Sequence, residues 1–204
     1  MNDRPTNIVF DFGGVLMRHD RQGCLKALRQ LLSDEVITNI LGFGNDNPNT
    51  LRYRFEIGEC SRQEFLDSIL AHSKPGTTAQ KVIDAWNILH AGIDERTWEQ
   101  LEYLRNQGHR LYLMSNTDDI HWQHTCSLYG DKIDALFDEV FLSFKIGLVK
   151  PNGAFFKMVD NRIVDANQTL FVDDMEPNRL VAQASVGWNT YGVIDELMKV
   201  LTKE

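Results

Sequence analysis

The sequence predicts an α/β fold in which helices cover both faces of a parallel sheet, with an all-helical segment inserted after the first strand. From about residue 94 onward, short apolar runs alternate with amphipathic helical patterns, which is typical of the strand–helix units that build a parallel sheet. Between residues 20 and 92, apolar residues recur at helical spacing and no convincing strand pattern separates them. We therefore expect the first strand and the later units to share one core.

The first strand is predicted near the N-terminus. Residues 7–11 (NIVFD) form a short apolar run that ends in an acidic residue, and Gly13 and Gly14 then break the pattern. A continuous apolar run of this length is typical of a strand that is buried on both faces of a parallel sheet. We expect its carboxyl end to deliver Asp11, and we expect residues 15–17 to form a short flap.

Helical patterns dominate the inserted segment. They cover residues 21–32, 61–71 and 78–90, where apolar residues recur every three or four positions. Ser61 lies three residues before Glu64, and this capping-box arrangement marks a helix start. The segment is therefore predicted to be an all-helical insertion.

The remaining elements complete a Rossmann-like, three-layer core. Asp94 is predicted to cap the next helix, and Pro151 is predicted to open a later one, at a position that suits proline. The other predicted elements are the strands at residues 110–114, 140–142, 169–173 and 188–191, and the helices from about 118, at 177–185 and at 195–201. We expect residues 1–16 and 93–204 to form the core domain and residues 17–92 to form a cap domain.

The composition excludes several classes of protein. The chain has 204 residues, of which 21 are basic and 29 are acidic, and its formal net charge is −8. Such an acidic chain lacks the positive field that non-specific nucleic-acid binding needs. It contains no apolar run of the roughly 18–20 residues that a membrane helix requires, and residues 1–6 are polar. We therefore expect no nucleic-acid partner and no membrane partner.

The three cysteines, Cys24, Cys60 and Cys126, are scattered along the chain. Their odd number and the absence of C-x-x-C spacing argue against a disulfide framework and against a zinc site. Free thiols are typical of a reducing compartment. We expect a cytoplasmic protein that is a monomer or a weak dimer.

Polar side chains suited to a single site follow the predicted strands. In an open parallel sheet, ligands bind beyond the carboxyl ends of the strands. The first strand ends at Asp11, the second at residues 115–117 (SNT) and the fourth at Asp173 and Asp174, while Lys150 follows the third. Carboxylates bind a hard cation such as Mg²⁺, whereas hydroxyl, backbone N–H and ammonium groups bind phosphate oxygens. A carboxylate beside such a metal can attack phosphorus and form an aspartyl-phosphate.

These residues also have simpler interpretations. Asp11 or the pair Asp173 and Asp174 could cap a turn, and Ser115 could cap a helix, a role that is compatible with phosphate binding. Lys145 also follows the third strand, but it is more typical of a solvated lysine than of a ligand.

A pair of histidines is a further candidate for metal binding. His121 and His124 share one face of a predicted helix. No third ligand lies near them in the sequence, so we interpret them as surface or partly packed histidines.

Four motifs occur in order, each at a predicted strand end or helix start. They are residues 9–16 (VFDFGGVL), 113–117 (LMSNT), 147–151 (GLVKP) and 170–174 (LFVDD). With these motifs in this order, the chain resembles the haloacid dehalogenase superfamily of aspartyl phosphatases, and the helical insertion lies where that family carries its cap. Residues 104–110 (LRNQGHR) and 141–143 (FLS) make it most similar to the bacterial α-D-glucose-1-phosphate phosphatase group.

The resemblance implies a Mg²⁺-dependent phosphatase of small phosphorylated metabolites, such as the sugar phosphate glucose 1-phosphate, that acts through an aspartyl-phosphate. It implies that Asp11 is the nucleophile. It also implies that the metal ligands are Asp11, the backbone carbonyl of Gly13 and the carboxylate of Asp174. Asp173 takes the place of a glycine in the usual motif and would act nearby or through water. The residues implied to bind the transferring phosphoryl group are Ser115, Asn116 and Lys150, and Lys150 is also implied to be catalytic.

One position departs from the family pattern. Most phosphatases of this family carry a second aspartate two residues after the nucleophile, as general acid and base, and here that position is Gly13. General acid–base help typically contributes roughly 10²–10⁴-fold to the rate. Its loss matters least for a substrate with a relatively acidic leaving hydroxyl, such as a sugar 1-phosphate. His19 or Asp20, just after the flap, could replace the missing acid.

Two other functions stay open at this point. A 2-haloacid dehalogenase would use Asp11 on carbon without a metal, but Asp173 and Asp174 argue against it, and the comparable dehalogenases carry an aromatic residue where Gly13 stands. A weakly catalytic or non-catalytic phosphometabolite-binding protein is compatible with the missing acid. Mg²⁺-dependent phosphate release separates the phosphatase from both alternatives, and chloride release identifies the dehalogenase.

Overall fold

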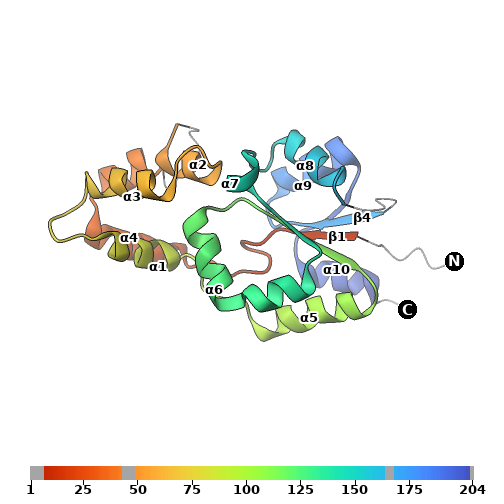
Figure 1. The fold of residues 1–204 in the computed structure, drawn as a ribbon. Helices are drawn as coiled ribbons and strands as arrows, with labels where there is room; N and C mark the ends of the chain where they lie inside the picture. The colour runs from red at the N-terminus through yellow and green to blue at the C-terminus, as the bar shows by residue number, and fades with distance from the viewer. Residues whose placement is uncertain (1–6, 43–48, 164–167, 203–204) are drawn as a thin grey trace.

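A single parallel sheet forms the centre of the protein in a computed structural model, which describes residues 7–42, 49–163 and 168–202. Within these ranges, five parallel strands lie in the order β3-β2-β1-β4-β5 (Figure 1). The strands are β1 (Asn7–Phe10), β2 (Arg110–Ser115), β3 (Glu139–Leu142), β4 (Thr169–Val172) and β5 (Asn189–Tyr191). The predicted parallel α/β core is confirmed, with β1 as its central strand. Residues 1–6, which the sequence analysis assigned to the core domain, lie outside the described residues.

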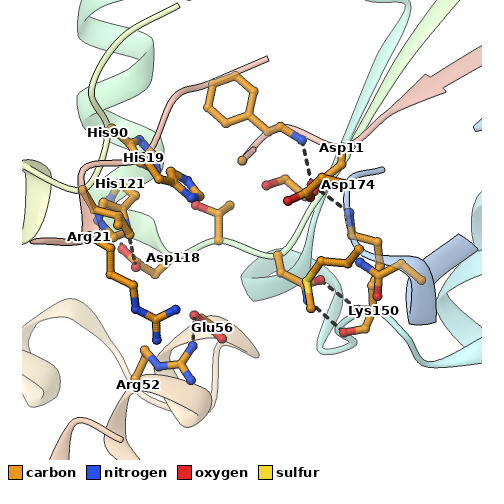
Figure 2. Close-up of a pocket in the computed structure, with 18 of the residues that line it drawn as sticks. Asp11, His19, Arg21, Arg52, Glu56, His90, Asp118, His121, Lys150 and Asp174 are labelled. Atoms are coloured by element: carbon orange, nitrogen blue, oxygen red, sulfur yellow. Dashed lines mark hydrogen bonds and ion pairs between the residues drawn. The ribbon is translucent and has the colours of Figure 1, made fainter. Parts of the chain in front are cut away.

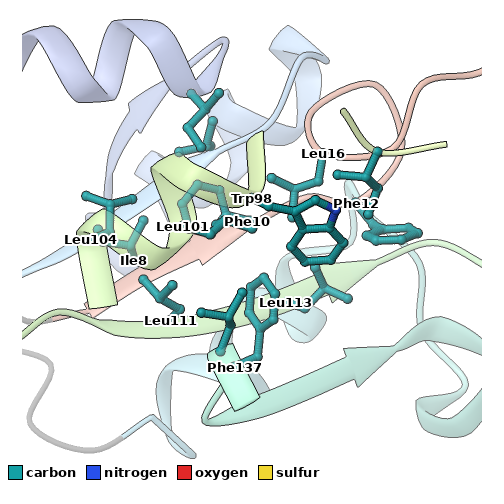
Figure 3. Packing of buried hydrophobic residues seen from close by; sticks show 14 of the residues in the cluster. Ile8, Phe10, Phe12, Leu16, Trp98, Leu101, Leu104, Leu111, Leu113 and Phe137 are labelled. Atoms are coloured by element: carbon teal, nitrogen blue, oxygen red, sulfur yellow. The ribbon is translucent and has the colours of Figure 1, made fainter. Parts of the chain in front are cut away.

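The two faces of the sheet are covered by different helices, which gives the predicted three layers. Because side chains alternate along a strand, Ile8 and Phe10 of β1 belong to one hydrophobic cluster and Val9 belongs to another. The first cluster includes residues of α5 (Glu95–Asn106), α6 (Asp119–Leu136) and α10 (Ile194–Leu201). The second includes residues of α8 (Gly153–Asp160) and α9 (Glu176–Val186). Figure 3 shows Trp98 and Leu101 of α5 packed on the first face.

The segment between β1 and α5 is helical, as predicted, and extends to one side of the sheet (Figure 1). It contains α1 (Arg21–Leu31), the π-helix η1 (Val36–Ile40), α2 (Leu51–Glu56), α3 (Arg62–Leu70) and α4 (Ala79–Asn87). These elements enclose a hydrophobic cluster of their own, to which α6 adds Ile120. Ser61 and Glu64 form the predicted capping box at the start of α3. The sequence pattern missed η1 and α2, because five or six residues are too few to display a helical period.

The expected helix start at Pro151 is wrong. Asn152 caps α8 instead, and its side-chain Oδ1 accepts a hydrogen bond from the N–H of Ala154 at 2.9 Å. Pro151 precedes this cap, because the asparagine side chain supplies the acceptor that the first turn of the helix needs. Asp94, in contrast, caps α5 as predicted and accepts from the N–H of Thr97 at 2.9 Å.

Within the described ranges, no helix combines the length and the apolar character needed to cross a bilayer.

Candidate active site

Asp11 lies at the carboxyl edge of the sheet, directly after the central strand. Its N–H continues the pairing of β1 with β4 by donating to the carbonyl of Val172 at 2.8 Å. Its carboxylate is largely buried, and Oδ1 accepts a hydrogen bond from the N–H of Phe12 at 2.7 Å. Burial raises the pKa of Asp11 to about 6, although Lys150 acts in the opposite direction. The strand end therefore holds this carboxylate in one orientation.

Lys150 is buried beside Asp11. Its Nζ lies 2.7 Å from Oδ1 of Asp11 and 2.7 Å from Oδ2 of Asp173. Burial alone would lower the pKa of Lys150, but the two carboxylates raise it above its usual value. Lys150 is therefore a buried cation held between the ends of β1 and β4.

The two adjacent acids after β4 have different surroundings. Asp173 is buried, and both of its oxygens are engaged: it accepts from the N–H of Met175 at 2.9 Å, from Nδ2 of Asn178 at 3.0 Å, and from Lys150. Asp174 is exposed, and its carboxylate has no ion-pair partner among the described residues. Asp173 therefore positions Lys150, whereas Asp174 is available to a ligand.

The three acids form a group that could hold a metal ion. Asp11, Asp173 and Asp174 each offer a carboxylate oxygen, and these atoms lie within 4.8 Å of one another. Oxygen donors at this spacing suit a hard divalent cation such as Mg²⁺. Because the oxygens of Asp173 are already engaged, Asp11 and Asp174 fit the direct ligand role better, with Gly13 beside them in the same cavity.

Gly13 stands where a side chain would meet His19. A Cβ atom built on Gly13 would lie 2.7 Å from Nε2 of His19 and closer still to Cε1. The imidazole thus fills the space that the missing acid would use. Burial and the neighbouring charge of His121 lower the pKa of His19. Asp20, the other candidate acid, caps α1 by accepting from the N–H of Gly23 at 2.7 Å.

The residues after β2 and β3 meet at the same edge. Ser115 is buried and lines the cavity. Asn116 lines it as well, but its amide is engaged with the backbone of Lys150: it accepts from the N–H at 2.8 Å and donates to the carbonyl at 2.9 Å. Lys145 is exposed and lies outside the cavity lining, in agreement with the simpler interpretation of this residue. Asn116 therefore has a positioning role that the sequence did not indicate.

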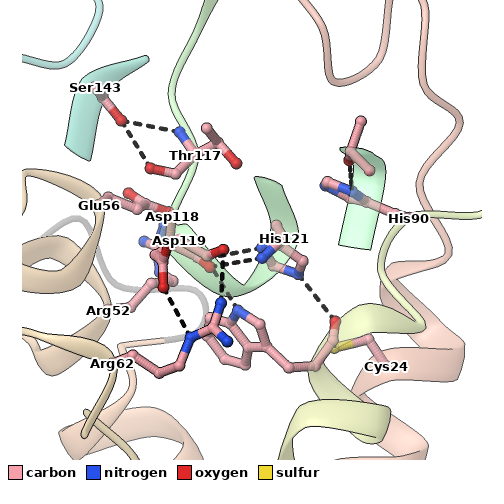
Figure 4. Close-up of polar contacts among 12 residues, drawn as sticks. Cys24, Arg52, Glu56, Arg62, His90, Thr117, Asp118, Asp119, His121 and Ser143 are labelled. Atoms are coloured by element: carbon pink, nitrogen blue, oxygen red, sulfur yellow. Dashed lines mark hydrogen bonds and ion pairs between the residues drawn. The ribbon is translucent and has the colours of Figure 1, made fainter. Parts of the chain in front are cut away.

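A serine to which the sequence analysis assigned no role fixes the loop after β2. Ser143 opens the short helix α7 (Ser143–Ile146), which was not predicted either. Its buried hydroxyl donates to the carbonyl of Thr117 and accepts from the N–H of Thr117, both at 2.9 Å (Figure 4). The two residues are 26 positions apart, so no local pattern could reveal this pair.

A cavity of about 410 Å³ connects these residues with the helical insertion. The sheet edge supplies one side of it, including Asp11, Ser115, Lys150 and Asp174, and Arg21, Arg52, Glu56, Trp86 and His90 from the insertion line it as well. Figure 2 shows Arg52 and Glu56 across the cavity from Lys150 and Asp174. A ligand in this cavity would touch both parts of the protein.

His121 is fully packed rather than a surface histidine. It is buried, its Nδ1 lies 2.7 Å from Oδ2 of Asp118, and its Nε2 lies 3.0 Å from the carbonyl oxygen of Trp86 (Figure 4). Both partners accept hydrogen bonds, so both ring nitrogens carry protons. Burial would lower the pKa of His121, but the Asp118 carboxylate raises it. Both ring nitrogens of His121 are therefore engaged within the protein, and neither is free to bind a metal ion together with His124.

Comparison with known proteins places this architecture in a family. Residues 6–184 match the family model of haloacid dehalogenase-like hydrolases. The chain belongs to the haloacid dehalogenase-like hydrolase family. The resemblance carried by the four motifs is therefore confirmed.

This haloacid dehalogenase-like hydrolase is similar to relatives named as phosphatases over most of its length. It is 28% identical over 190 residues to the D-ribitol-5-phosphate phosphatase of Bacteroides thetaiotaomicron, covering 91% of this chain and 90% of the relative. It is also 28% identical over 183 residues to a sesquiterpene phosphatase of Aspergillus oryzae, covering 86% and 84%. A haloacid dehalogenase family enzyme of B. thetaiotaomicron, solved with magnesium and inorganic phosphate, matches with 30% identity and a TM-score of 0.80, covering 92% of this chain and 93% of that one.

Proposed function

We propose that this hydrolase is a Mg²⁺-dependent phosphatase of small phosphorylated metabolites, and that sugar phosphates such as glucose 1-phosphate are its substrates. One observation carries the proposal: Asp11, at the end of the central strand, is paired with the buried Lys150 and lies near the exposed carboxylate of Asp174, at the wall of a cavity. Relatives named as phosphatases, and a similar structure with magnesium and phosphate, support it.

Asp11 is the proposed nucleophile. Its Oδ1 is held by the N–H of Phe12 and by Lys150, which leaves Oδ2 to approach phosphorus. As the bond from Oδ2 to phosphorus forms, the bond from phosphorus to the ester oxygen breaks and the leaving alcohol takes up a proton. Water then attacks the aspartyl-phosphate, releases inorganic phosphate and restores the carboxylate.

Lys150 and Ser115 are proposed to bind the transferring phosphoryl group. The ammonium of Lys150 is already fixed by Asp11 and Asp173, so it needs no reorganisation when the charge on the phosphoryl oxygens develops. Asn116 contributes by holding the backbone of Lys150, and it can also present its remaining amide hydrogen to the cavity.

Asp11, Asp174 and the backbone carbonyl of Gly13 are proposed to hold Mg²⁺. The bound ion would offset the negative charge of the phosphoryl group and of the acids around it. Asp173 would support the site indirectly through Lys150 and Asn178. This division follows from the burial and bonding of Asp173 and from the exposure of Asp174.

We further propose that residues 17–92 act as a cap domain on a core of residues 1–16 and 93–204. The separate hydrophobic cluster of the insertion supports this division. The cap side of the cavity carries Arg21, Arg52 and Glu56, a polar lining that favours a hydroxylated leaving group over an apolar one.

A substrate screen tests the proposed function. Purified protein is incubated with sugar phosphates, nucleotides, acyl phosphates and 2-haloacids, with Mg²⁺ or with EDTA. We expect Mg²⁺-dependent release of inorganic phosphate, highest with sugar 1-phosphates, and no release of chloride. Chloride release from a 2-haloacid without Mg²⁺, or no phosphate release from any monoester, would contradict the proposal.

A further inference from the structure

An ion pair on helix α2 faces the proposed catalytic residues across the cavity. Nη1 of Arg52 lies 2.8 Å from Oε1 of Glu56, one helical turn along. The two side chains are 28% and 20% exposed, so most of their surface is withdrawn from solvent. Both line the cavity that Asp11 also lines (Figure 2).

The position of this pair is fixed by the packing of α2. Leu51 and Phe55, on the adjoining face, are buried in the hydrophobic cluster of the insertion, and Phe55 stacks on Phe65 with ring centroids 4.2 Å apart. The turn after α2 contacts the core: Gly58 has a φ of +72°, and a Cβ atom there would clash with the carbonyl oxygen of Phe144. The ion pair is therefore held at a defined place relative to the sheet edge.

Arg52 keeps hydrogen-bonding capacity that no described residue uses. Its Nε is buried and has no hydrogen-bond partner within the described part of the chain. A guanidinium has five N–H donors, and the contact with Glu56 uses one of them. The guanidinium lines the cavity and has more N–H donors than the contact with Glu56 uses, so a ligand oxygen in the cavity is a natural partner for it.

The chemistry of the pair narrows the group that it can bind. Hydroxyl groups both donate and accept, so neighbouring hydroxyls can accept from Arg52 and donate to Glu56 at the same time. A second anionic group would be repelled by the carboxylate of Glu56, and a hydrocarbon group would desolvate the ion pair and leave the remaining N–H donors of Arg52 without partners. We propose that Arg52 and Glu56 form a specificity subsite that binds the hydroxyl groups of the leaving alcohol, a sugar or sugar alcohol. This inference rests on the proposed phosphatase function.

Equilibrium binding tests the subsite without requiring turnover. Glucose 1-phosphate, ribitol 5-phosphate and phenyl phosphate are titrated by calorimetry, in the presence of Mg²⁺, into protein that carries Asp11→Asn, alone and combined with Arg52→Met or Glu56→Gln. The matched control is Arg29→Met, which removes an exposed ion pair with Asp34 on the same insertion. Thermal unfolding of each variant shows whether the fold is kept.

We expect Arg52→Met to weaken binding of both polyol phosphates by about 10- to 100-fold, as the loss of charge-assisted hydrogen bonds does. Glu56→Gln should weaken it less, and neither change should alter binding of phenyl phosphate. Equal losses for all three ligands, or no loss for any, would overturn the subsite. Stronger binding of the polyol phosphates by Glu56→Gln would also overturn it. A failed phosphatase assay with the wild-type protein would refute the catalytic proposal, but it would leave these binding ratios decisive for the subsite.

Discussion

The imidazole of His19 occupies the space in which a side chain on Gly13 would begin. A Cβ atom at position 13 would lie 2.7 Å from Nε2 of His19. The ring of His19 is also stacked on His90, with centroids 5.8 Å apart and planes 10° from parallel. The family's second aspartate is thus absent here, and its place is filled.

Gly13→Asp alone is expected to disturb the protein rather than to restore a general acid. The new side chain must displace His19 from its stack on His90; because His19 is exposed, this should cost less than the roughly 1–3 kcal/mol that overpacking of a core typically costs. We expect a lower melting temperature and no gain in phosphatase activity. Adding His19→Ala should make room, recover stability and raise turnover of sugar 6-phosphates. A stable, more active Gly13→Asp single variant would show that the ring does not block the position.

The dependence of the rate on the pKa of the leaving group shows whether a general acid is missing from the site. Without a proton donor at position 13, we expect the rate of phosphoryl transfer to rise steeply as the pKa of the leaving alcohol falls. Sugar 1-phosphates should then react faster than 6-phosphates. The measurement is a rate series over aryl and alkyl phosphates of graded pKa, with chemistry shown to be rate-limiting. A flat series would mean that another group, with His19 the nearest, supplies the proton.

Asp174→Ala and Asp173→Ala should have different consequences. The carboxylate of Asp174 is exposed, so its removal should raise the Mg²⁺ concentration for half-maximal activity at least about tenfold and leave the melting temperature unchanged. Asp173→Ala removes a buried partner of Lys150 and Asn178, which typically costs about 3–5 kcal/mol of stability. Metal titrations and thermal unfolding of both variants check this. The opposite ranking in the metal titration would exchange their roles.

The His121–Asp118 pair should make stability depend on pH. The pKa of His121 is raised in the folded protein, so its contribution is complete below the unfolded value of about 6.5. That contribution should be lost as the pH rises through the higher folded-state pKa. Urea unfolding should therefore show His121→Gln less stable than wild type at pH 6, with a gap that narrows toward pH 9. His124→Gln, on the same helix, is the control, and a gap that widens with pH would contradict this assignment.

The sequence predicted those features that depend on neighbours along the chain. The apolar run before Asp11 gave a strand and its end, and Ser61 and Asp94 marked helix starts because a cap acts within three residues. The helix start predicted at Pro151 was wrong because the next residue, Asn152, caps the helix instead. Local patterns therefore placed the strands, their ends and the longer helices, but not the short helices η1, α2 and α7.

Contacts between distant residues could not be predicted in the same way. His121 meets the backbone of Trp86 across 35 positions, and Asn116 holds Lys150 across 34. The sequence does not show which distant residue each of these side chains contacts. His121 was therefore interpreted as a surface or partly packed histidine, and Asn116 as a ligand of phosphate only. The cavity-lining pair Arg52 and Glu56 was missed because the short helix that carries it has no visible period.

Release of inorganic phosphate by the wild-type protein and by Asp11→Asn, measured side by side with and without Mg²⁺, tests the role of Asp11 most directly. The amide can still accept hydrogen bonds from Phe12 and Lys150, so the variant should fold, but it cannot accept a phosphoryl group. We predict phosphate release from glucose 1-phosphate only when both Mg²⁺ and Asp11 are present. Near-normal release by cleanly purified Asp11→Asn would contradict the assignment of the nucleophile.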